Sequence, residues 1–483
     1  MFTSVIHDAG LQYPDDDEYF SPDNSWPEYR IGHIARKPNP VYTAVRQCLA
    51  DACLDKERFG KPDWNPLGDY ISPGDNVFVL CNFVQQKTRT RSDSAFFAKC
   101  THGSVVRAVI DYVLLALKGR GSISFGNAPL QSCKWLEVTK QSGALHVEEF
   151  YKRFSRDAVS VSLVDLRGHV MRRSALGAVR TEFHAEGGDN SIDVELKHES
   201  LLEELYESSH FPRFRVMDYD PKRIERCHQP GRHAYIISRR ILESDVIVSI
   251  PKLKTHEKVG ITCGIKGSVG AVAHKDCLAH HRYGPPRQNG DEYPDRLGFL
   301  RFVSALHDRA YSSEATLVKT ALHSANHFSR RVICRFTRAL SGSWPGNDTC
   351  WRMAVDLARI IKYADRTGRM HSAPQRSHIV LTDGVIAGEG DGPLYPRPVH
   401  FGYLSWSSDV VVGDYVNAIA MGFDPNRLSI LREATRVSDY PLTHVDPWQQ
   451  TIRINGRCTT VSALKSSFGD KKFAPPREWR GFL

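Results

Sequence analysis

The feature that most constrains the fold is the short apolar run 246–250 (VIVSI), which is followed at once by a segment rich in lysine and glycine. A run of this kind is typical of a strand that is buried on both faces of a parallel sheet. Pro251 has no N–H to give to a sheet ladder, so it ends the run. Ligands in open α/β sheets bind beyond the carboxyl ends of such strands. The sequence therefore predicts a ligand site over residues 251–282, although a basic segment after a strand can also be an ordinary solvated turn.

The chain before this run shows the same pattern of apolar strands followed by polar residues. Residues 77–80 and 120–125 have the composition of buried strands, and a helix is predicted between them, with Ser104 as its N-cap and Gly119 as its stop. A strand–helix–strand order with polar residues after each strand is typical of a parallel sheet with flanking helices. The predicted fold class is therefore α/β with a mainly parallel sheet.

Changes in composition divide the chain into four parts. Residues 1–40 are polar and contain several prolines, which predicts an irregular N-terminal arm. Residues 41–295 form the N-terminal α/β portion, and 296–375 have helical periodicity throughout, which predicts a helical insertion. The α/β pattern returns in a C-terminal portion over 376–483, where a strand leads into a second glycine-rich loop at 383–393, this time acidic.

Composition favours some partners over others. The net charge of +9 is moderate and favours an anionic small molecule, because no known nucleic-acid-binding module accompanies it. There is no run of eighteen apolar residues, so no membrane span is predicted. The first residues lack a basic segment followed by an apolar one, which argues against a signal peptide. We therefore expect a cytoplasmic protein with no nucleic-acid partner, and the sequence does not indicate its oligomeric state.

The cysteine spacing and the lack of known phosphate-binding motifs argue against several cofactors. The eleven cysteines are scattered and form no C-x-x-C pair, so neither a zinc ribbon nor a ferredoxin-type cluster is indicated. The chain also lacks a P-loop and a dinucleotide-binding glycine fingerprint, so ATP and NAD are not supported as cofactors. The cofactor stays unidentified, with a divalent metal as one alternative.

The basic segment carries the residue types that acid–base chemistry requires. His256 titrates near neutral pH and suits proton transfer. A lysine that is withdrawn from water can become a nucleophile or can stay charged and hold an anion, and this applies to Lys254 and Lys266. These three residues are the predicted catalytic group; the alternative is a satisfied loop histidine beside surface lysines.

Polar side chains in this segment and at the neighbouring strand ends are predicted to bind the substrate. Asp383 and Glu389 would orient hydroxyls or a cation, and His280 and His281 are alternative metal ligands, although their spacing matches no closed zinc pattern. The predicted substrate-binding residues are Asn82, Thr101, His102, Asn127, Thr255, Lys258, Thr262, His280, His281, Arg282, Asp383 and Glu389.

The assembled motifs resemble a bacterial and archaeal family, domain of unknown function 362. The resemblance is carried by WNPLGDYISPGDNV (64–77), THGSVVRAVIDY (101–112), GNAPLQS (126–132), PKLKTHEKVGIT (251–262), DGVIAGEGDGP (383–393) and MGFDP (421–425). It implies an α/β fold with a site at these loops but no assigned reaction. The chain departs from the family pattern at Leu80, Asn127 and Gly267, where lysine, aspartate and asparagine are expected, which leaves open an altered substrate or a weakened activity.

A fainter similarity is to the nickel-pincer lactate racemases, which also place a histidine and then a lysine after a buried strand. The interval from His256 to Lys266 looks like theirs. That similarity implies fold and site location, not nickel. The function predicted from the sequence is an enzyme that acts on an anionic, hydroxylated metabolite by lysine- and histidine-assisted proton or hydride chemistry. The alternatives are a metal- or cluster-dependent redox protein and a non-catalytic binding protein.

Overall fold

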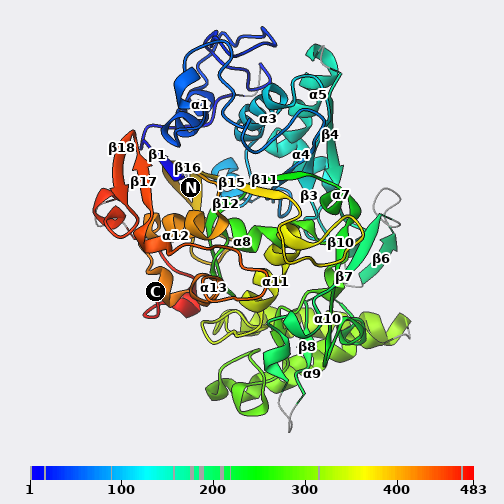
Figure 1. Ribbon diagram of the computed structural model, residues 1–483. Coiled ribbons are helices and arrows are strands. Elements are labelled where there is room, and N and C mark those ends of the chain that lie inside the picture. Colours follow the sequence, from blue (N-terminus) through cyan, green and yellow to red (C-terminus); the bar gives the residue numbers. More distant parts are fainter. Residues whose placement is uncertain are drawn as a thin grey trace.

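The computed structural model describes residues 3–15, 18–88, 90–155, 158–173, 179–183, 190–206, 211–217, 219–313, 316–468 and 472–483. Its centre is one mixed sheet with the strand order β18-β17-β1-β16-β15-β11-β2-β3-β4. Neighbouring strands are parallel from β15 through β11, β2 and β3 to β4, and β16 is antiparallel to both β15 and β1. The predicted α/β fold with a mainly parallel sheet is confirmed (Figure 1). The strands are β1 Thr3–His7, β2 Asn76–Cys81, β3 Ser122–Asn127, β4 Ser160–Asp165, β11 Val246–Ile250, β15 Ser377–Glu389, β16 Arg397–Ser407, β17 Thr451–Ile454 and β18 Arg457–Thr460.

Helices cover both faces of this sheet, as the continuous apolar strands require (Figure 1). Along β2, Val77 and Val79 enter the core on one face, and Phe78 and Leu80 enter the core on the other. The first face is covered by α1 Pro40–Asp51, α3 Gly103–Leu117, α4 Trp135–Ser142 and α5 Ala144–Phe154. The second is covered by α8 Cys263–Gly267, α11 Cys350–Tyr363, α12 Val410–Ala420 and α13 Ser429–Ala434.

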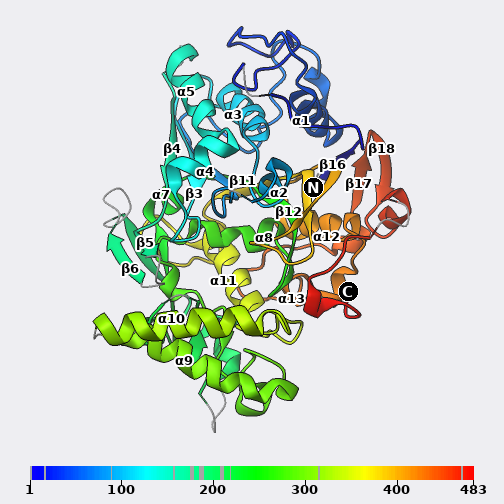
Figure 2. The same ribbon diagram turned by 180° about the vertical axis from the view of Figure 1, so that it is seen from behind.

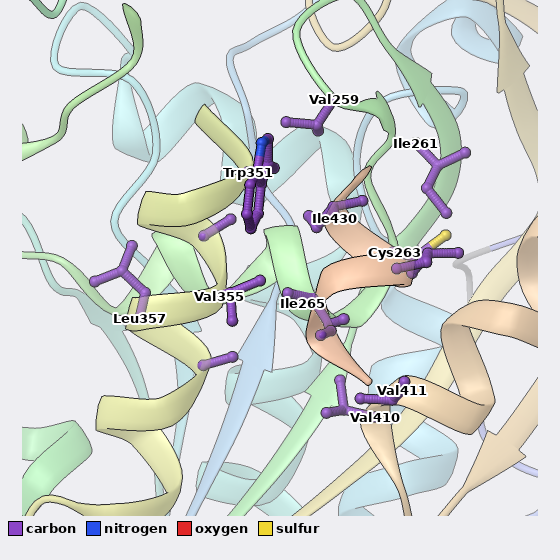
Figure 3. Close-up of a cluster of buried hydrophobic side chains, with 14 of the residues drawn as sticks. Val259, Ile261, Cys263, Ile265, Trp351, Val355, Leu357, Val410, Val411 and Ile430 are labelled. Atoms are coloured by element: carbon purple, nitrogen blue, oxygen red, sulfur yellow. The ribbon is translucent and has the colours of Figure 1, made fainter. Parts of the chain in front are cut away.

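The short helix α8 is held firmly in the second layer. Figure 3 shows Ile265 of α8 between Val355 of α11 and the pair Val410 and Val411 of α12, and all of these side chains are buried. A Cβ added to Gly264 would lie 2.7 Å from Val410 Cγ2, so the glycine is what permits this close approach of helices. Because Ile265 is packed on two sides, the direction in which the side chain of the following residue, Lys266, leaves α8 is fixed.

Smaller elements extend from the sheet. The strands β5 and β6 form an antiparallel hairpin, and β7 pairs antiparallel with β10. The helices α9 and α10 lie together at the end of the molecule opposite α1 and α5 (Figure 2). The bounds are β5 His169–Arg173, β6 Val179–Phe183, β7 Ser191–Glu195, β8 Phe214–Arg215, β9 His228–Gln229, β10 Arg232–Ser238, β14 His281–Arg282, α2 Asp93–Phe97, α6 Pro221–Cys227, α7 Arg239–Leu242, α9 Arg301–Ser312 and α10 Thr316–Ile333.

Three local expectations are wrong. Residues expected as loops continue as strand: β12 Lys252–His256 follows Pro251, and β15 runs on to Glu389 because its edges are occupied by β12 and β16. The N-cap of α3 is His102 and not Ser104, since the backbone N–H of Ser104 donates to His102 Nδ1 at 3.1 Å. The strands β17 and β18 form a hairpin that turns at Asn455 and Gly456.

Candidate active site: a lysine and histidine cavity

The strand β12 and its return partner β13 (Gly260–Ile261) position most of the predicted catalytic residues. β12 pairs parallel to β15 and antiparallel to β13, with His256 opposite Gly260. The turn needs Gly260 because its φ is +85° and a Cβ there would lie 2.2 Å from Leu428. The chain then enters α8, so Lys254 and His256 come from β12 and Lys266 comes from α8, all shortly after one buried strand.

These side chains meet around a cavity of about 260 Å³ at the carboxyl ends of β2, β3 and β11. This is the position at which open α/β sheets bind ligands. The predicted site residues that line it are Asn82, Asn127, Lys254, His256, Lys258, Thr262, Lys266 and His280.

Lys254 is fully buried and is held by two neutral acceptors. Its Nζ donates to Asn82 Oδ1 at 2.5 Å and to the carbonyl oxygen of Lys99 at 2.7 Å. The pKa of Lys254 is lowered to about 7, mainly by burial; Cys100 opposes this shift, and the charges of Lys252, Lys99 and Lys266 add to it. The two acceptors use two N–H groups in either protonation state, so the third position on Nζ carries a proton for an anion or a lone pair for a carbonyl carbon.

Lys266 is the least compensated charge in the cavity. Among the described residues, its ammonium has neither a hydrogen-bond acceptor nor a carboxylate partner, although its side chain is buried. Burial lowers its pKa, and the nearby Cys350 only partly opposes this. The N-terminus of α8 gives no help to an anion here, since the backbone N–H groups of Gly264 and Ile265 donate to Asp414 at 2.7 and 2.8 Å. A buried ammonium without a partner is costly, so an anionic ligand is the natural complement.

The two histidines of the cavity differ in which ring nitrogen carries the proton. His256 Nδ1 accepts the backbone N–H of Lys258 at 3.1 Å, so the proton of the neutral ring is on Nε2. His280 Nδ1 lies 3.1 Å from the carbonyl oxygen of Leu278, which can only accept, so Nδ1 is protonated and Nε2 has a lone pair. Burial, and then Lys266 and Lys258, hold the pKa of both rings well below the usual range, so both are neutral. His256 can therefore donate a hydrogen bond from Nε2, and His280 can accept a proton at Nε2.

Sequence reasoning missed the remaining walls of the cavity. Lys275 is buried, its Nζ donates to the carbonyl oxygen of Val269 at 2.7 Å, and burial followed by the charge of Lys266 lowers its pKa to about 7. Its position between the apolar segments 271–273 and 277–279 was the signal for a buried lysine. Much of the remaining lining is apolar and comes from distant segments with no sequence signal: Phe83, Val84, Pro129, Leu130, Met171, Val216, Met217, Leu278 and Leu394.

Two atoms of the lining have unmet hydrogen-bonding capacity. Asn127 donates through Nδ2 to the carbonyl oxygen of Phe83 at 2.9 Å, but its Oδ1 is buried without a partner among the described residues. Thr262 Oγ1 is also buried without a hydrogen-bond partner among the described residues. A hydroxyl or carbonyl on a ligand would satisfy atoms of this kind.

The other predicted substrate-binding residues lie away from the lining and have structural contacts. Asp383 binds Lys252, Tyr13 and the backbone N–H of His102. Glu389 pairs with Arg397 at 2.9 Å. The hydroxyls of Thr101 and Thr255 donate to the carbonyl oxygens of Ile250 and Gly390, Arg282 donates to Asn289, and His281 pairs through β14 with β8. The described residues contain no group of three or more histidine, cysteine, aspartate or glutamate side chains placed to hold a metal ion.

The pKa values of Lys254 and Lys275 predict a pH dependence of anion binding. Each lysine attracts an anion only while protonated, and each loses its proton near pH 7. The affinity for a carboxylate such as benzoate should therefore be constant below pH 6 and should fall above pH 7, by up to about tenfold per pH unit for each lysine. Titration calorimetry from pH 5 to 9 measures this. A Lys254→Met variant should bind more weakly at low pH and show a shallower fall, and an unchanged slope would contradict the assignment.

The same lysines predict how stability changes with pH. In the unfolded chain they keep their protons up to about pH 10, whereas in the folded protein they lose them near pH 7. Between these values the unfolded state binds more protons, so the free energy of unfolding should rise with pH, by about 1.4 kcal/mol per pH unit for each lysine. Urea denaturation at pH 7, 8 and 9 tests this, and a Lys254→Met/Lys275→Met variant should show a flatter profile.

Fold and site together define an α/β protein with a cationic, partly apolar cavity at the carboxyl edge of a parallel sheet. Residues 199–418 match the model of the family described as Domain of unknown function (DUF362). The resemblance drawn from the motifs is thereby confirmed over these residues. The matched segment contains β11, β12, α8 and the cavity lysines, while Asn82 and Asn127 come from outside it.

A thylakoid-associated protein of Synechocystis sp. is 21% identical over 226 residues, which cover 44% of this chain and 48% of that protein. The match thus spans about half of that relative's length. No solved structure matches the chain, and the similarity to lactate racemases stays an analogy.

Proposed function

We propose that the protein is an enzyme that acts on an anionic small molecule by proton transfer at a carbon next to the anionic group. The observation that carries this proposal is Lys266, a buried ammonium without a partner among the described residues, beside two neutral histidines. The anion would lie against Lys266 and Lys254. The Nε2 of His280 would take the proton from that carbon and later return it, while His256 would donate a hydrogen bond from Nε2 to the negative charge that develops on the substrate.

The lining also indicates the body of the substrate. Apolar side chains such as Leu130 and Met217 form much of the wall, and the carboxylates expected to orient several hydroxyls, Asp383 and Glu389, are bound elsewhere. Asn127 and Thr262 leave places for one hydroxyl or carbonyl. A carboxylate with a neighbouring hydroxyl or oxo group and an apolar body fits these features best. Hydride transfer on the same substrate is the alternative predicted from the sequence, and a cytoplasmic location stays a prediction.

Hydrogen exchange at carbon tests the proposal without knowledge of the full reaction. A panel of 2-oxo and 2-hydroxy carboxylates with apolar bodies is incubated with the protein in D₂O, and loss of the C–H signal next to the carboxylate or carbonyl is followed by NMR. At least one member should exchange. His280→Gln and His256→Asn should each slow that exchange by about a hundredfold or more, the usual contribution of a positioned acid or base. Exchange that persists in both variants would contradict the assigned roles.

A non-catalytic binding protein is the second candidate, and one observation favours it. Leu80, which stands where the family pattern has lysine, is buried in the hydrophobic core, so no charge reaches the cavity from that position. Tight binding of a panel member without exchange at any carbon would support this candidate against the first. Absence of anion binding would contradict both.

A further inference from the structure

The helix α10 carries its apolar stripe on the outside of the molecule. Leu317 is 88% exposed, Phe328 69% and Val318 54%, and Val332 and the alanines at 321 and 325 are exposed beside them. The positions 317, 321, 325, 328 and 332 follow the three- and four-residue spacing of one helix face. In a helix that packs only on its own protein this stripe would face inward.

The inward side of α10 is polar instead. His323 and Asn326 are the buried side chains there, and they contact α9: the Nδ2 group of Asn326 donates to His307 Nδ1 at 3.2 Å, and the ring of His323 packs against that of Tyr311. These contacts fix which face is outside. The exposed stripe therefore follows from the packing of the helix and not from fraying at its end.

The charge around the stripe has one sign. Between Thr316 and Arg338 the chain has five lysine and arginine residues and no aspartate or glutamate. Arg331 and Arg335 are exposed, and neither has a carboxylate partner among the described residues. An apolar helix face bordered by cations is complementary to an anionic lipid surface, because the apolar side chains enter the acyl boundary while the cations meet phosphates.

We propose that the outer face of α10, the stripe Leu317–Val332 with Arg331, together with Arg335 in the turn after the helix, docks the protein on the surface of an anionic lipid bilayer. No helix in the described part of the chain is long and apolar enough to cross a bilayer, so the contact is interfacial. A symmetric contact with a second copy would bring the same arginines together and is disfavoured by their repulsion. A single convex helix can also lie on a bilayer surface without a complementary groove.

The other side of α10 adjoins the wall of the lysine and histidine cavity. Arg330 Nη2 lies 3.9 Å from the sulfur of Met217, which lines the cavity, and donates to Ser341 Oγ at 3.0 Å. The carbonyl oxygen of Ser341 in turn accepts from Lys258 Nζ. Docking through α10 would thus hold the cavity wall about one helix diameter, ~10 Å, from the bilayer surface.

Vesicle flotation with the full-length protein tests the proposal. The protein should float with vesicles of phosphatidylcholine and phosphatidylglycerol, should float far less with phosphatidylcholine alone, and should be released by salt. Leu317→Glu/Phe328→Glu should lower the vesicle-bound fraction by about tenfold or more, and Arg331→Glu/Arg335→Glu by a similar factor. The control is Leu136→Glu, which places a glutamate at another exposed leucine (68%), on α4, and should float as the wild type does.

Three results would overturn the proposal. The first is a wild-type protein that does not float with the anionic vesicles. The second is a Leu317→Glu/Phe328→Glu variant that floats as well as Leu136→Glu. The third is a wild-type dimer in light scattering that this variant converts to a monomer without any vesicle binding by the wild type, which would assign the face to self-association. Equal thermal midpoints of the variants confirm that these exposed positions do not disturb the fold.

Discussion

Replacing Asp383 with asparagine is expected to lower the free energy of unfolding by about 3–5 kcal/mol, the usual cost of removing one partner from a buried ion pair. Lys252 Nζ lies 2.9 Å from Asp383 Oδ1, and both side chains are fully buried. Asparagine keeps the shape and loses the charge, so the ammonium of Lys252 would be left in the interior without a counterion. Urea denaturation measures the change.

The strand β15 supplies a matched control for this substitution. Glu389 lies at its end, was predicted for the same substrate-binding role, and pairs with Arg397 near the surface, where the arginine is 64% exposed. Glu389→Gln should cost less than about 1 kcal/mol, because exposed ion pairs contribute little. Equal losses in the two variants would contradict the structural role of Asp383.

A double replacement separates the ion pair from the site. Lys252→Met/Asp383→Asn should recover most of the stability lost in Asp383→Asn, since removal of both charges leaves neither one buried alone. Anion binding at the cavity should also survive, because neither residue lines it. Loss of binding in a folded double variant would mean that Asp383 acts on the ligand after all.

The contacts of Asp383 show what could not be predicted from the sequence. In the sequence the carboxylate directly follows the apolar run of a predicted strand, a position that favours ligand binding, and nothing nearby in the sequence marks its partners. They arrive from far away: Tyr13 of the N-terminal arm donates to Asp383 at 2.6 Å, and its ring stacks on His102, whose backbone N–H donates to the same carboxylate. An arm expected to be irregular thus completes a buried polar cluster. Long-range contacts of this kind leave no periodic or compositional trace.

Local signals predicted the strands whose carboxyl ends form the edge of the cavity. The apolar run 246–250 is the strand β11 with its carboxyl end at the cavity, and the strands expected at 77–80 and 120–125 are its neighbours β2 and β3. Parallel strands bring their carboxyl ends to one edge, which is why Asn82, Asn127 and the lysines after β11 converge. The apolar half of the cavity could not be predicted, because side chains such as Met171, Met217 and Leu394 meet there only through tertiary packing.

Replacing Lys266 with methionine is expected to move stability and ligand affinity in opposite directions. The free energy of unfolding should rise by about 1–4 kcal/mol, the range found when buried ions give way to apolar residues of similar size. The affinity for a carboxylate probe such as benzoate should fall by about a hundredfold, since one partner of a buried charge pair is removed from the complex. Urea denaturation and titration calorimetry on the same preparation measure the two changes. The control is Lys61→Met at an exposed position, which should alter neither.

Opposite changes in the free energy of unfolding and in ligand affinity distinguish a ligand-binding lysine from a structural one. Lys252 and Lys266 both come from the segment after β11, and both are buried, but the protein provides a carboxylate for the first and, among its described residues, none for the second. Removal of a lysine that stabilises the fold must destabilise the protein, as expected for Lys252→Met alone. When the counterion of a buried lysine is the ligand, the desolvation cost of the lysine is not offset in the free protein and is offset only when the ligand binds. Removal of such a lysine therefore stabilises the empty protein and weakens the complex. A Lys266→Met variant that unfolds more easily and still binds the probe would therefore assign the lysine to the fold and leave the cavity without its anion.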